Sequence, residues 1–357
     1  MKVGIGLYRH MLTPDYYRFA RQAGCTHVVI HLVDYFNQGS QSTASADQPI
    51  GDAQGWGHAG DSEALWTLEN LLAIKRQVQD AGLEIAAIEN LDPAHWHDVL
   101  LDGPRKQTQL EQLKRLIHDI GAAGVPILGY NFSLAGVCSR VSGPFARGQA
   151  VSVGMDGVDD TPVPKGMVWN MVYDPKAPPG NQAPVTHEQL WERLACFLEA
   201  LVPAAEEAGV TLAAHPDDPP MPVVRQTPRL IYQPHLYQRL LDLYPSPANA
   251  LEFCLGSLAE MTEGDVYEAV EQYAGQGKIA YVHFRNVRGK VPRYREVFID
   301  EGDLDMIRVL RILKKHDFDG VLIPDHTPRL TCAAPWHAGM AYALGYMKAA
   351  LQMLEEV

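Results

Sequence analysis

The stretch Ala213-Ala214-His215-Pro216-Asp217-Asp218-Pro219-Pro220 ends a short apolar run with a histidine, which two acidic residues between prolines then follow. Three later apolar runs also finish on a side chain that can bind a metal ion, namely Cys254, His283 and Asp325. A helix-length segment separates each run from the next. If the runs are neighbouring parallel strands, the four side chains meet at one end of the sheet. The pattern therefore predicts repeated strand–helix units and a metal site.

Strand-like and helical patterns alternate along the whole chain. The clearest helix covers 186–208, where Thr186 and Gln189 form a capping box and Gly209 ends the helix. Parallel strands need helical crossovers and covered faces, so this order predicts an α/β fold of the (β/α)₈ TIM-barrel type. A doubly wound open sheet is the structural alternative. The eight predicted strands are 3–6, 28–32, 84–89, 125–131, 210–215, 250–254, 279–284 and 321–324.

The two ends of this barrel differ in loop length. Helix-to-strand joints are short, whereas strand-to-helix connections contain long insertions at about 33–63 and 133–185. Active sites of barrel enzymes are built from the connections that follow the strands, so the insertions fall where chemistry is expected. The segment 133–185 is rich in Gly, Pro and Val and has no clear helical period. We expect one domain over 1–357, with this segment serving either as a surface loop or dimer contact, or as a lid over substrate.

Composition limits the classes of partner. The chain has 357 residues, 46% of them hydrophobic, and a net charge of −13, which argues against nucleic acid and anionic membranes as partners. No apolar run approaches the roughly 20 residues that span a bilayer, and the start has no signal-peptide pattern. The five cysteines are odd in number and form no C-x-x-C pair, which argues against a disulfide framework. A soluble cytoplasmic protein is expected.

The metal prediction depends on a coincidence of four residues. A lone histidine at a strand end is more often a hydrogen-bonded core residue, and a lone strand cysteine is usually buried and inert. Here His215, Cys254, His283 and Asp325 end consecutive strands. Mixed imidazole, thiolate and carboxylate ligation suits a divalent transition metal rather than Mg²⁺ or Ca²⁺. Zn²⁺, Fe²⁺ and Mn²⁺ stay open, and ligand softness alone favours zinc or iron.

Several motifs together carry a family resemblance. They are His215-Pro216-Asp217-Asp218-Pro219-Pro220, Pro228-Arg229-Leu230, Cys254-Leu255-Gly256-Ser257-Leu258, Val282-His283-Phe284-Arg285-Asn286-Val287, residues 300–306, Pro324-Asp325-His326 and, upstream, Tyr130-Asn131-Phe132. From about Leu65 onward the chain resembles the D-mannonate dehydratases of the hexuronate pathway. The resemblance implies a xylose-isomerase-like barrel, Mn²⁺ or Fe²⁺ bound by the same four residues, and dehydration of D-mannonate to 2-keto-3-deoxygluconate. It shifts the expected metal from zinc towards manganese, and dimeric relatives suggest a homo-oligomer.

The implied chemistry assigns roles to further residues. His326 follows the ligand Asp325 and could move a proton near neutral pH, or else only orient Asp325. Arg285 lies two residues after His283, so strand alternation places it beside that ligand, where it could bind the substrate carboxylate or pair with nearby acids. Candidate substrate contacts are Tyr130, Asn131, Asp217, Asp218, Glu89, His31, Arg140 and Arg229. Glu89 is also a possible second acid/base group.

Departures from the family pattern lie in the substrate-binding stretches. The expected Arg-Trp-Tyr-Gly is Gly6-Leu7-Tyr8-Arg9-His10 here, and Trp-Thr-Arg-Thr is Cys138-Ser139-Arg140-Val141, which keeps only the arginine. The family's acid/base tyrosine after the last strand has no clear counterpart, so His337 or Tyr342 could replace it. A hydro-lyase acting on mannonate or a related aldonic acid is the favoured interpretation. A sugar isomerase or epimerase using a metal-stabilised enediolate is the alternative, and a noncatalytic sugar-binding barrel is the third.

Overall fold

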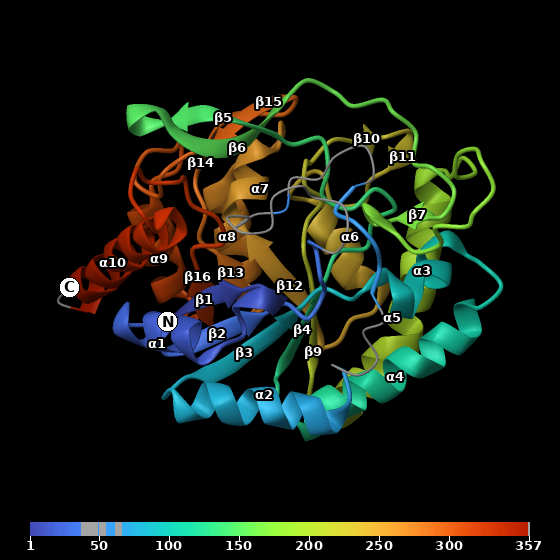
Figure 1. Ribbon diagram of the computed structural model, residues 1–357, viewed down its shortest axis with the longest axis horizontal. Coiled ribbons are helices and arrows are strands. Elements are labelled where there is room, and N and C mark those ends of the chain that lie inside the picture. Colours follow the sequence, from blue (N-terminus) through green and yellow to red (C-terminus); the bar gives the residue numbers. More distant parts are fainter. Residues whose placement is uncertain (37–48, 50–54, 61–65, 356–357) are drawn as a thin grey trace.

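The computed structural model describes residues 1–36, 49, 55–60 and 66–355, so most of the insertion at 33–63 lies outside the described residues. Eight parallel strands close into a barrel because the last of them, β16, pairs back onto β1 (Figure 1). The predicted (β/α)₈ barrel is confirmed, and the open-sheet alternative is wrong. In barrel order the strands are β1 (Lys2–Leu7), β2 (His27–Ile30), β3 (Glu84–Glu89), β4 (Ile127–Tyr130), β9 (Thr211–Ala214), β12 (Asn249–Cys254), β13 (Ile279–His283) and β16 (Val321–Ile323).

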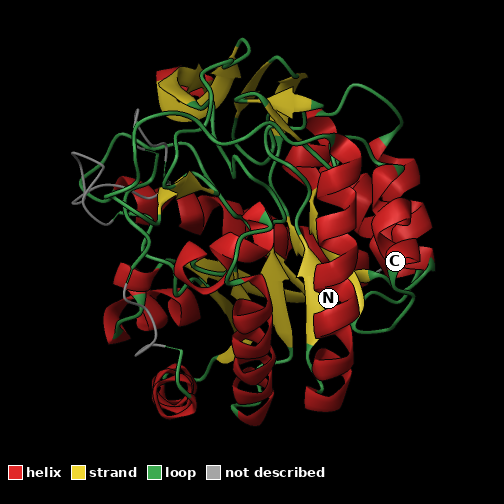
Figure 2. Cartoon of the chain, turned by 90° about the vertical axis from the view of Figure 1, so that its right-hand side faces the viewer, coloured by secondary structure: helices red, strands yellow, loops and turns green. Residues whose placement is uncertain are grey.

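Helices surround the barrel and cover the outer faces of its strands (Figures 1 and 2). The longest described ones, α5 and α10, follow the fourth and the eighth barrel strand. The helices are α1 (Pro14–Gln22), α2 (Leu68–Asp80), α3 (Pro93–Leu101), α4 (Lys106–Ala122), α5 (His187–Ala208), α6 (Leu236–Leu243), α7 (Leu255–Glu260), α8 (Val266–Gly275), α9 (Met306–Lys315) and α10 (Pro335–Glu355), with short 3₁₀ turns η1 (Arg9–Met11) and η2 (Arg147–Gln149). No helix in the described part of the chain is long and apolar enough to cross a membrane.

Helix α5 begins and ends where the sequence predicts. The Thr186 side chain accepts a hydrogen bond from the Gln189 backbone N–H at 3.2 Å, and the Gln189 side chain accepts from the Thr186 N–H at 2.9 Å. Both bonds satisfy N–H groups that the first turn of a helix leaves unpaired. Gly209 then adopts the left-handed conformation (φ 67°) that stops the helix. This local chemistry fixes the approach of the chain to β9 and so to the following His215.

Two hydrophobic clusters lie on opposite faces of the barrel strands. Val28 and Ile30 belong to the large outer cluster that includes the helices, whereas Val29 between them belongs to a small cluster drawn from the strands alone. Successive side chains of a strand point to opposite faces, so the small cluster, with Ala213 and Ile323, fills the barrel interior. The interior is therefore packed, and the open space lies at the ends of the strands.

The segment 133–185 is more ordered than the expected loop. It contains the hairpin β5 (Val141–Ala146) and β6 (Ala150–Asp156) and the short pair β7 (Met167–Val168) and β8 (Met171–Val172). The hairpin continues into β15 (Arg293–Glu296) and β14 (Val287–Lys290), which gives a four-stranded antiparallel sheet. This sheet lies beyond one end of the barrel, as does the pair β10 (Val223–Val224) and β11 (Thr227–Pro228) (Figures 1 and 2). The connections after the strands thus build a second layer over the barrel mouth.

Candidate active site

Strand register brings the four predicted metal ligands together. Cys254 and His283 are directly paired residues of β12 and β13, and His215 follows β9 on the other side of β12. Ligand atoms of His215, Cys254 and His283 all lie within 4.8 Å of one another. Asp325 comes two residues after the end of β16, and its Oδ2 lies 3.5 Å from His283 Nδ1. The structure thus places an imidazole pair, a sulfur and a carboxylate at one point of the barrel mouth.

The orientation of the two imidazoles suits metal binding. His215 Nδ1 donates to the Pro216 carbonyl at 2.6 Å, which leaves Nε2 with its lone pair available. His283 Nε2 faces the carboxylates of Glu89 and Glu252, each at 3.1 Å. Its Nδ1 is buried and has no hydrogen-bond partner among the described residues. A buried nitrogen of this kind, with a carboxylate behind the same ring, is typical of a histidine that binds a metal ion.

The electrostatics also favour a cation. Burial by itself raises the pKa of Cys254, but Arg285 and the two imidazoles outweigh burial and hold the pKa well below its usual range, which favours the thiolate form of the sulfur. Burial lowers the pKa of His215, yet Glu252 and the Cys254 sulfur overcome it and raise the pKa to about 9. The site therefore stabilises positive charge on its imidazoles. A divalent ion would meet the same field, so the residues present fit a metal ion.

Glu252 was missed by the sequence reasoning. It is fully buried on β12 and, with Glu89 and His283, forms a second group whose ligand atoms lie within 4.8 Å of one another. Burial and the neighbouring Glu89 raise the pKa of Glu252 to about 7. The alternation that places Arg285 beside His283 also places Glu252 on the same face as Cys254, so the signal was present in the sequence. Gly129 makes room for it, because a Cβ there would lie 2.5 Å from Glu252 Oε2.

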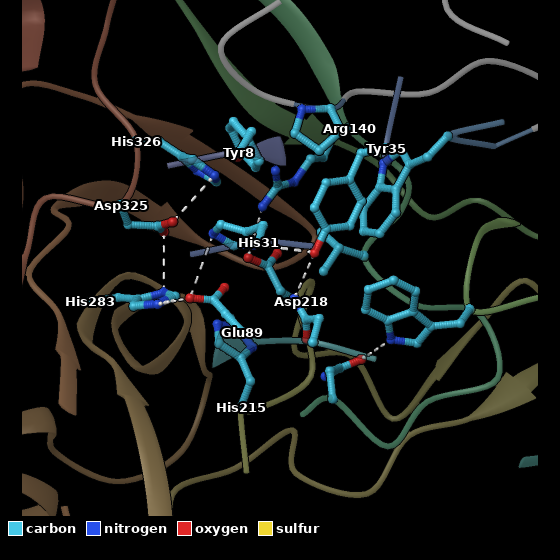
Figure 3. Close-up of a pocket in the computed structure, with 16 residues that line it drawn as sticks. Tyr8, His31, Tyr35, Glu89, Arg140, His215, Asp218, His283, Asp325 and His326 are labelled. Atoms are coloured by element: carbon cyan, nitrogen blue, oxygen red, sulfur yellow. Dashed lines mark hydrogen bonds and ion pairs between the residues drawn. The ribbon is translucent and has the colours of Figure 1, made fainter. Parts of the chain in front are cut away.

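A cavity opens next to these ligands (Figure 3). Three of the four metal-ligand candidates line it, together with His326 and several of the predicted substrate contacts. The lining residues are Tyr8, His31, Tyr35, Pro49, Trp56, Glu89, Asn90, Asn131, Val137, Arg140, Trp169, His215, Asp218, His283, Asp325 and His326.

His326 lines the cavity between Asp325 and Glu296. Its Nε2 lies 3.3 Å from Asp325 Oδ1 and its Nδ1 lies 3.3 Å from Glu296 Oε1. The preceding Asp325 has φ +63°, a left-handed backbone conformation that is costly for a residue with a side chain. Such strain is held only where the surrounding structure fixes it, and here it turns two consecutive side chains into one cavity.

The two site arginines are placed differently. Arg285 is buried behind the cavity and is engaged by Glu296, by Asp218 at 3.0 Å and by the Cys254 sulfur at 3.4 Å. Arg140 lines the cavity and pairs with Asp218 at 3.0 Å. Of these two arginines, Arg140 lines the cavity, whereas Arg285 lies outside its lining and is paired with nearby acids.

Five further candidates do not line this cavity. Asp217 accepts hydrogen bonds from Arg229 and from the backbone of residues 230 and 231, so the two side chains brace the loop after β9. Tyr130 is fully buried behind the barrel mouth. His337 packs against Phe19 with ring centroids 4.7 Å apart, and Tyr342 accepts a hydrogen bond from Arg147 at 3.3 Å. By contrast, Asn131, His31 and Glu89 do line the cavity.

Strand β15 supplies two site residues that sequence reasoning did not find. Glu296 lies beside Arg285 and His326, and Tyr294 donates to Asp218 Oδ1 at 3.1 Å. Ser152 of β6 donates to the Glu296 carbonyl at 2.6 Å, which ties the hairpin to this strand. An Arg-Tyr-Arg-Glu stretch between polar turns carries no signal that its partner strand lies more than 100 residues upstream.

Comparison with known proteins agrees with the motifs. The family model for D-mannonate dehydratase (UxuA) matches residues 22–141 and 181–353. A mannonate dehydratase of Streptococcus suis is 34% identical over 304 residues, which are 81% of this chain and 78% of the relative. Mannonate dehydratase 2 of Halalkalibacterium halodurans is 29% identical over 73% of this chain and 79% of its own.

Solved structures give the same result. The crystal structure of mannonate dehydratase from Streptococcus suis serotype 2 has a TM-score of 0.73 at 27% identity and covers 98% of this chain and 93% of its own. A xylose isomerase domain protein from Planctomyces limnophilus has a TM-score of 0.59 at 12% identity, covers 100% of this chain and 99% of its own, and shows the shared fold alone. With the family model matching well over half of the residues and the strand ends carrying the family motifs, this chain belongs to the D-mannonate dehydratase family.

Proposed function

We propose that this protein dehydrates D-mannonate or a closely related aldonic acid to the 2-keto-3-deoxy acid. The observation that carries the proposal is the convergence of His215, Cys254, His283 and Asp325 next to a cavity that His326 also lines, in a chain of this family. In this reaction the C2 proton is removed, the C3 hydroxyl leaves as water, and the enol tautomerises to the 2-keto acid. The reaction needs a site for a cation, a group that transfers the proton and a residue that binds the carboxylate.

The four residues would hold one divalent metal ion, with Mn²⁺ or Fe²⁺ proposed over Zn²⁺ on the family resemblance. Such an ion would stabilise the negative charge that develops next to the carboxylate as the C2 proton leaves. The thiolate of Cys254 is positioned by the Ser257 hydroxyl at 3.2 Å and by the Ser257 backbone N–H at 3.4 Å. His283 is oriented by Glu89 and Glu252, which hold its Nε2.

His326 is proposed to move the substrate proton. Its Nδ1 can donate to Glu296, which leaves Nε2 as the atom that accepts the C2 proton and later returns a proton to the departing hydroxyl. Glu296 is thereby a positioning residue, and the hairpin β5–β6 that supports β15 takes part in the site.

Arg140 is proposed to bind the substrate carboxylate in place of Arg285. A guanidinium carries five donors, and the contact to Asp218 uses only part of them. Arg285 is instead proposed to hold Cys254, Asp218 and Glu296 in place. This assignment fits the departure noted in the sequence, because Arg140 is the one residue kept from the expected Trp-Thr-Arg-Thr stretch.

The test is turnover of a panel of hexonic and pentonic acids by the purified protein, with and without added Mn²⁺. Metal-dependent release of a 2-keto-3-deoxy acid supports the proposal. Interconversion of epimers without a keto-deoxy product would instead assign the isomerase or epimerase alternative. His326→Gln, which should keep the metal and lose turnover, separates a proton-transfer role from a structural one.

A further inference from the structure

Three aromatic rings form one wall of the cavity. The ring centroids of Tyr35 and Trp56 lie 5.1 Å apart, those of Trp56 and Trp169 lie 5.3 Å apart, and those of Tyr35 and Trp169 lie 6.0 Å apart. Figure 3 shows Tyr35 across the cavity from Asp325 and His283. A substrate whose reacting carbons lie at the metal-ligand candidates therefore extends its distal end towards these rings. We call Tyr35, Trp56 and Trp169 the aromatic wall.

Two polar atoms at the aromatic wall lack a partner. Nε1 of Trp56 and Oδ1 of Asn90 are buried and have no hydrogen-bond partner among the described residues, and both residues line the cavity. The polar atoms around them are paired, because Trp169 Nε1 donates to Asn131 Oδ1 at 3.3 Å and Asn90 Nδ2 donates to the Tyr35 hydroxyl at 3.0 Å. The wall therefore retains one unused donor and one unused acceptor.

The other unpartnered atoms of the cavity lining lie at the end where the reaction is proposed. Within the described lining these are Nδ1 of His283, which faces the proposed metal site, and Nε of Arg140, whose guanidinium is proposed to bind the carboxylate. Trp56 Nε1 and Asn90 Oδ1 have no such role. Buried polar groups are normally paired, and each one left unpaired is costly. A donor and an acceptor left on one wall therefore indicate a bound group that satisfies both.

The backbone holds both residues in place. The Trp56 N–H donates to the Asn170 carbonyl at 2.8 Å, and the preceding Gly55 has φ +71° and lies so near this carbonyl that a Cβ would overlap it. Asn90 has φ +68°, and its N–H donates to the Gly129 carbonyl at 2.9 Å. Left-handed backbones persist where the surrounding structure fixes them. The unused donor and acceptor are therefore built features of the cavity.

We propose that Trp56 and Asn90 bind the terminal hydroxyl of the substrate, so that a hexonate is preferred over the corresponding 6-deoxyhexonate. The proposal rests on the proposed dehydration for the orientation of the substrate. A hydroxyl is both an acceptor and a donor, so it can accept from Trp56 Nε1 and donate to Asn90 Oδ1. A methyl group in its place leaves both atoms unpaired, and a site built to hydrogen-bond a hydroxyl discriminates strongly against an analogue that lacks it. The dehydration changes bonds only at C2 and C3, so this hydroxyl acts through binding alone.

The test compares D-mannonate with 6-deoxy-D-mannonate on the metal-loaded wild-type protein. We expect kcat/KM to be at least about tenfold higher for D-mannonate, because the deoxy acid leaves two buried groups unpaired. Trp56→Phe keeps an aromatic ring but removes the donor, so it should reduce this preference severalfold. Trp66→Phe is the matched control and should leave the ratio unchanged. Trp66 is as buried as Trp56, and its indole N–H also lacks a partner among the described residues, but it lies outside the cavity lining.

Calorimetric binding of both acids to His326→Gln, which removes the proposed proton transfer, separates this inference from the proposed reaction. If the wild type turns over neither acid but D-mannonate binds more tightly than the deoxy acid, the reaction assignment fails and the hydroxyl site stands. If the deoxy acid binds or reacts as well as D-mannonate, the inference is overturned while the dehydration stands. No binding of either acid overturns both. An equal ratio in wild type and Trp56→Phe would also overturn the inference, because Trp56 would then not set the preference.

Discussion

Replacement of Cys254 by serine tests the metal centre most directly. Cys254 is fully buried, and its sulfur accepts hydrogen bonds from Ser257 and lies 3.4 Å from Arg285 Nη2. Serine is close in size and can keep these contacts, so the fold should persist. A serine hydroxyl does not ionise as the thiolate does, so one anionic ligand is lost. We expect metal affinity to fall by at least about 100-fold, since even changes behind the ligands cost 10–100-fold.

The magnitude can be read as a change in stability on metal binding. At a metal concentration about 100 times the wild-type Kd, binding stabilises the fold by about 2.7 kcal/mol. A 100-fold weaker site at the same concentration gives only about 0.4 kcal/mol. Urea unfolding with and without Mn²⁺ measures this difference, and metal analysis of the purified proteins gives the occupancy directly.

A matched control is Cys25→Ser, because Cys25 is equally buried but lies outside the site. That variant can lose stability, yet its metal-induced gain should equal that of the wild type. If Cys254→Ser keeps the full gain and full occupancy, the thiolate is not a ligand. Among the residues that the structure describes, the group of Glu89, Glu252 and His283 would then be the other candidate for the ion.

Three other predictions concern the site and the fold. His326→Gln should lower kcat by roughly 10²–10⁴-fold, the usual contribution of a positioned acid/base group, while metal analysis shows unchanged occupancy; normal turnover would remove the assigned role. Arg140→Met should raise KM for the acid about 10–100-fold, the effect of one charge-assisted hydrogen bond, and Asp218 should stay in place because Arg285 and Tyr294 still hold it. Burial raises the pKa of Asp92, the N-cap of α3, to about 6, so the stability that it contributes is present at low pH and is lost as pH rises through 6. Between pH 4 and 7 the unfolding free energy of the wild type should therefore fall by about 2 kcal/mol relative to that of Asp92→Asn. Urea denaturation at several pH values measures both free energies, and an equal change with pH in the two proteins would refute this prediction.

The barrel could be predicted because its signals are local. Each strand is a short apolar run, and each helix has its own period and caps, as Thr186, Gln189 and Gly209 show for α5. The metal-ligand candidates follow from the same logic, because parallel strands in sequence order end at the same edge. Predicting those residues required no knowledge of long-range contacts.

The cavity could not be predicted in the same way. Two of its lining residues, His326 and Asp218, are contacted by Glu296 and Tyr294 of β15, and β15 pairs with β6, about 140 residues upstream, only in the folded chain, as Arg293 opposite Asp156 shows. The sequence therefore did not indicate that Glu296, Tyr294 and Trp169 lie at the site. It also suggested Tyr342 and His337, which are near His326 in sequence but contact other residues.

By itself the sequence determined the order of strands and helices, the closed barrel and the four donor residues, because spacing and side-chain type act over a few residues. Only the tertiary structure decided which of two arginines lines the cavity and which residues of β15 contact its lining. It did so because buried charges must find partners. Asp218 and Glu296 draw Arg285 away from the cavity, and Asp218 leaves Arg140 at its surface.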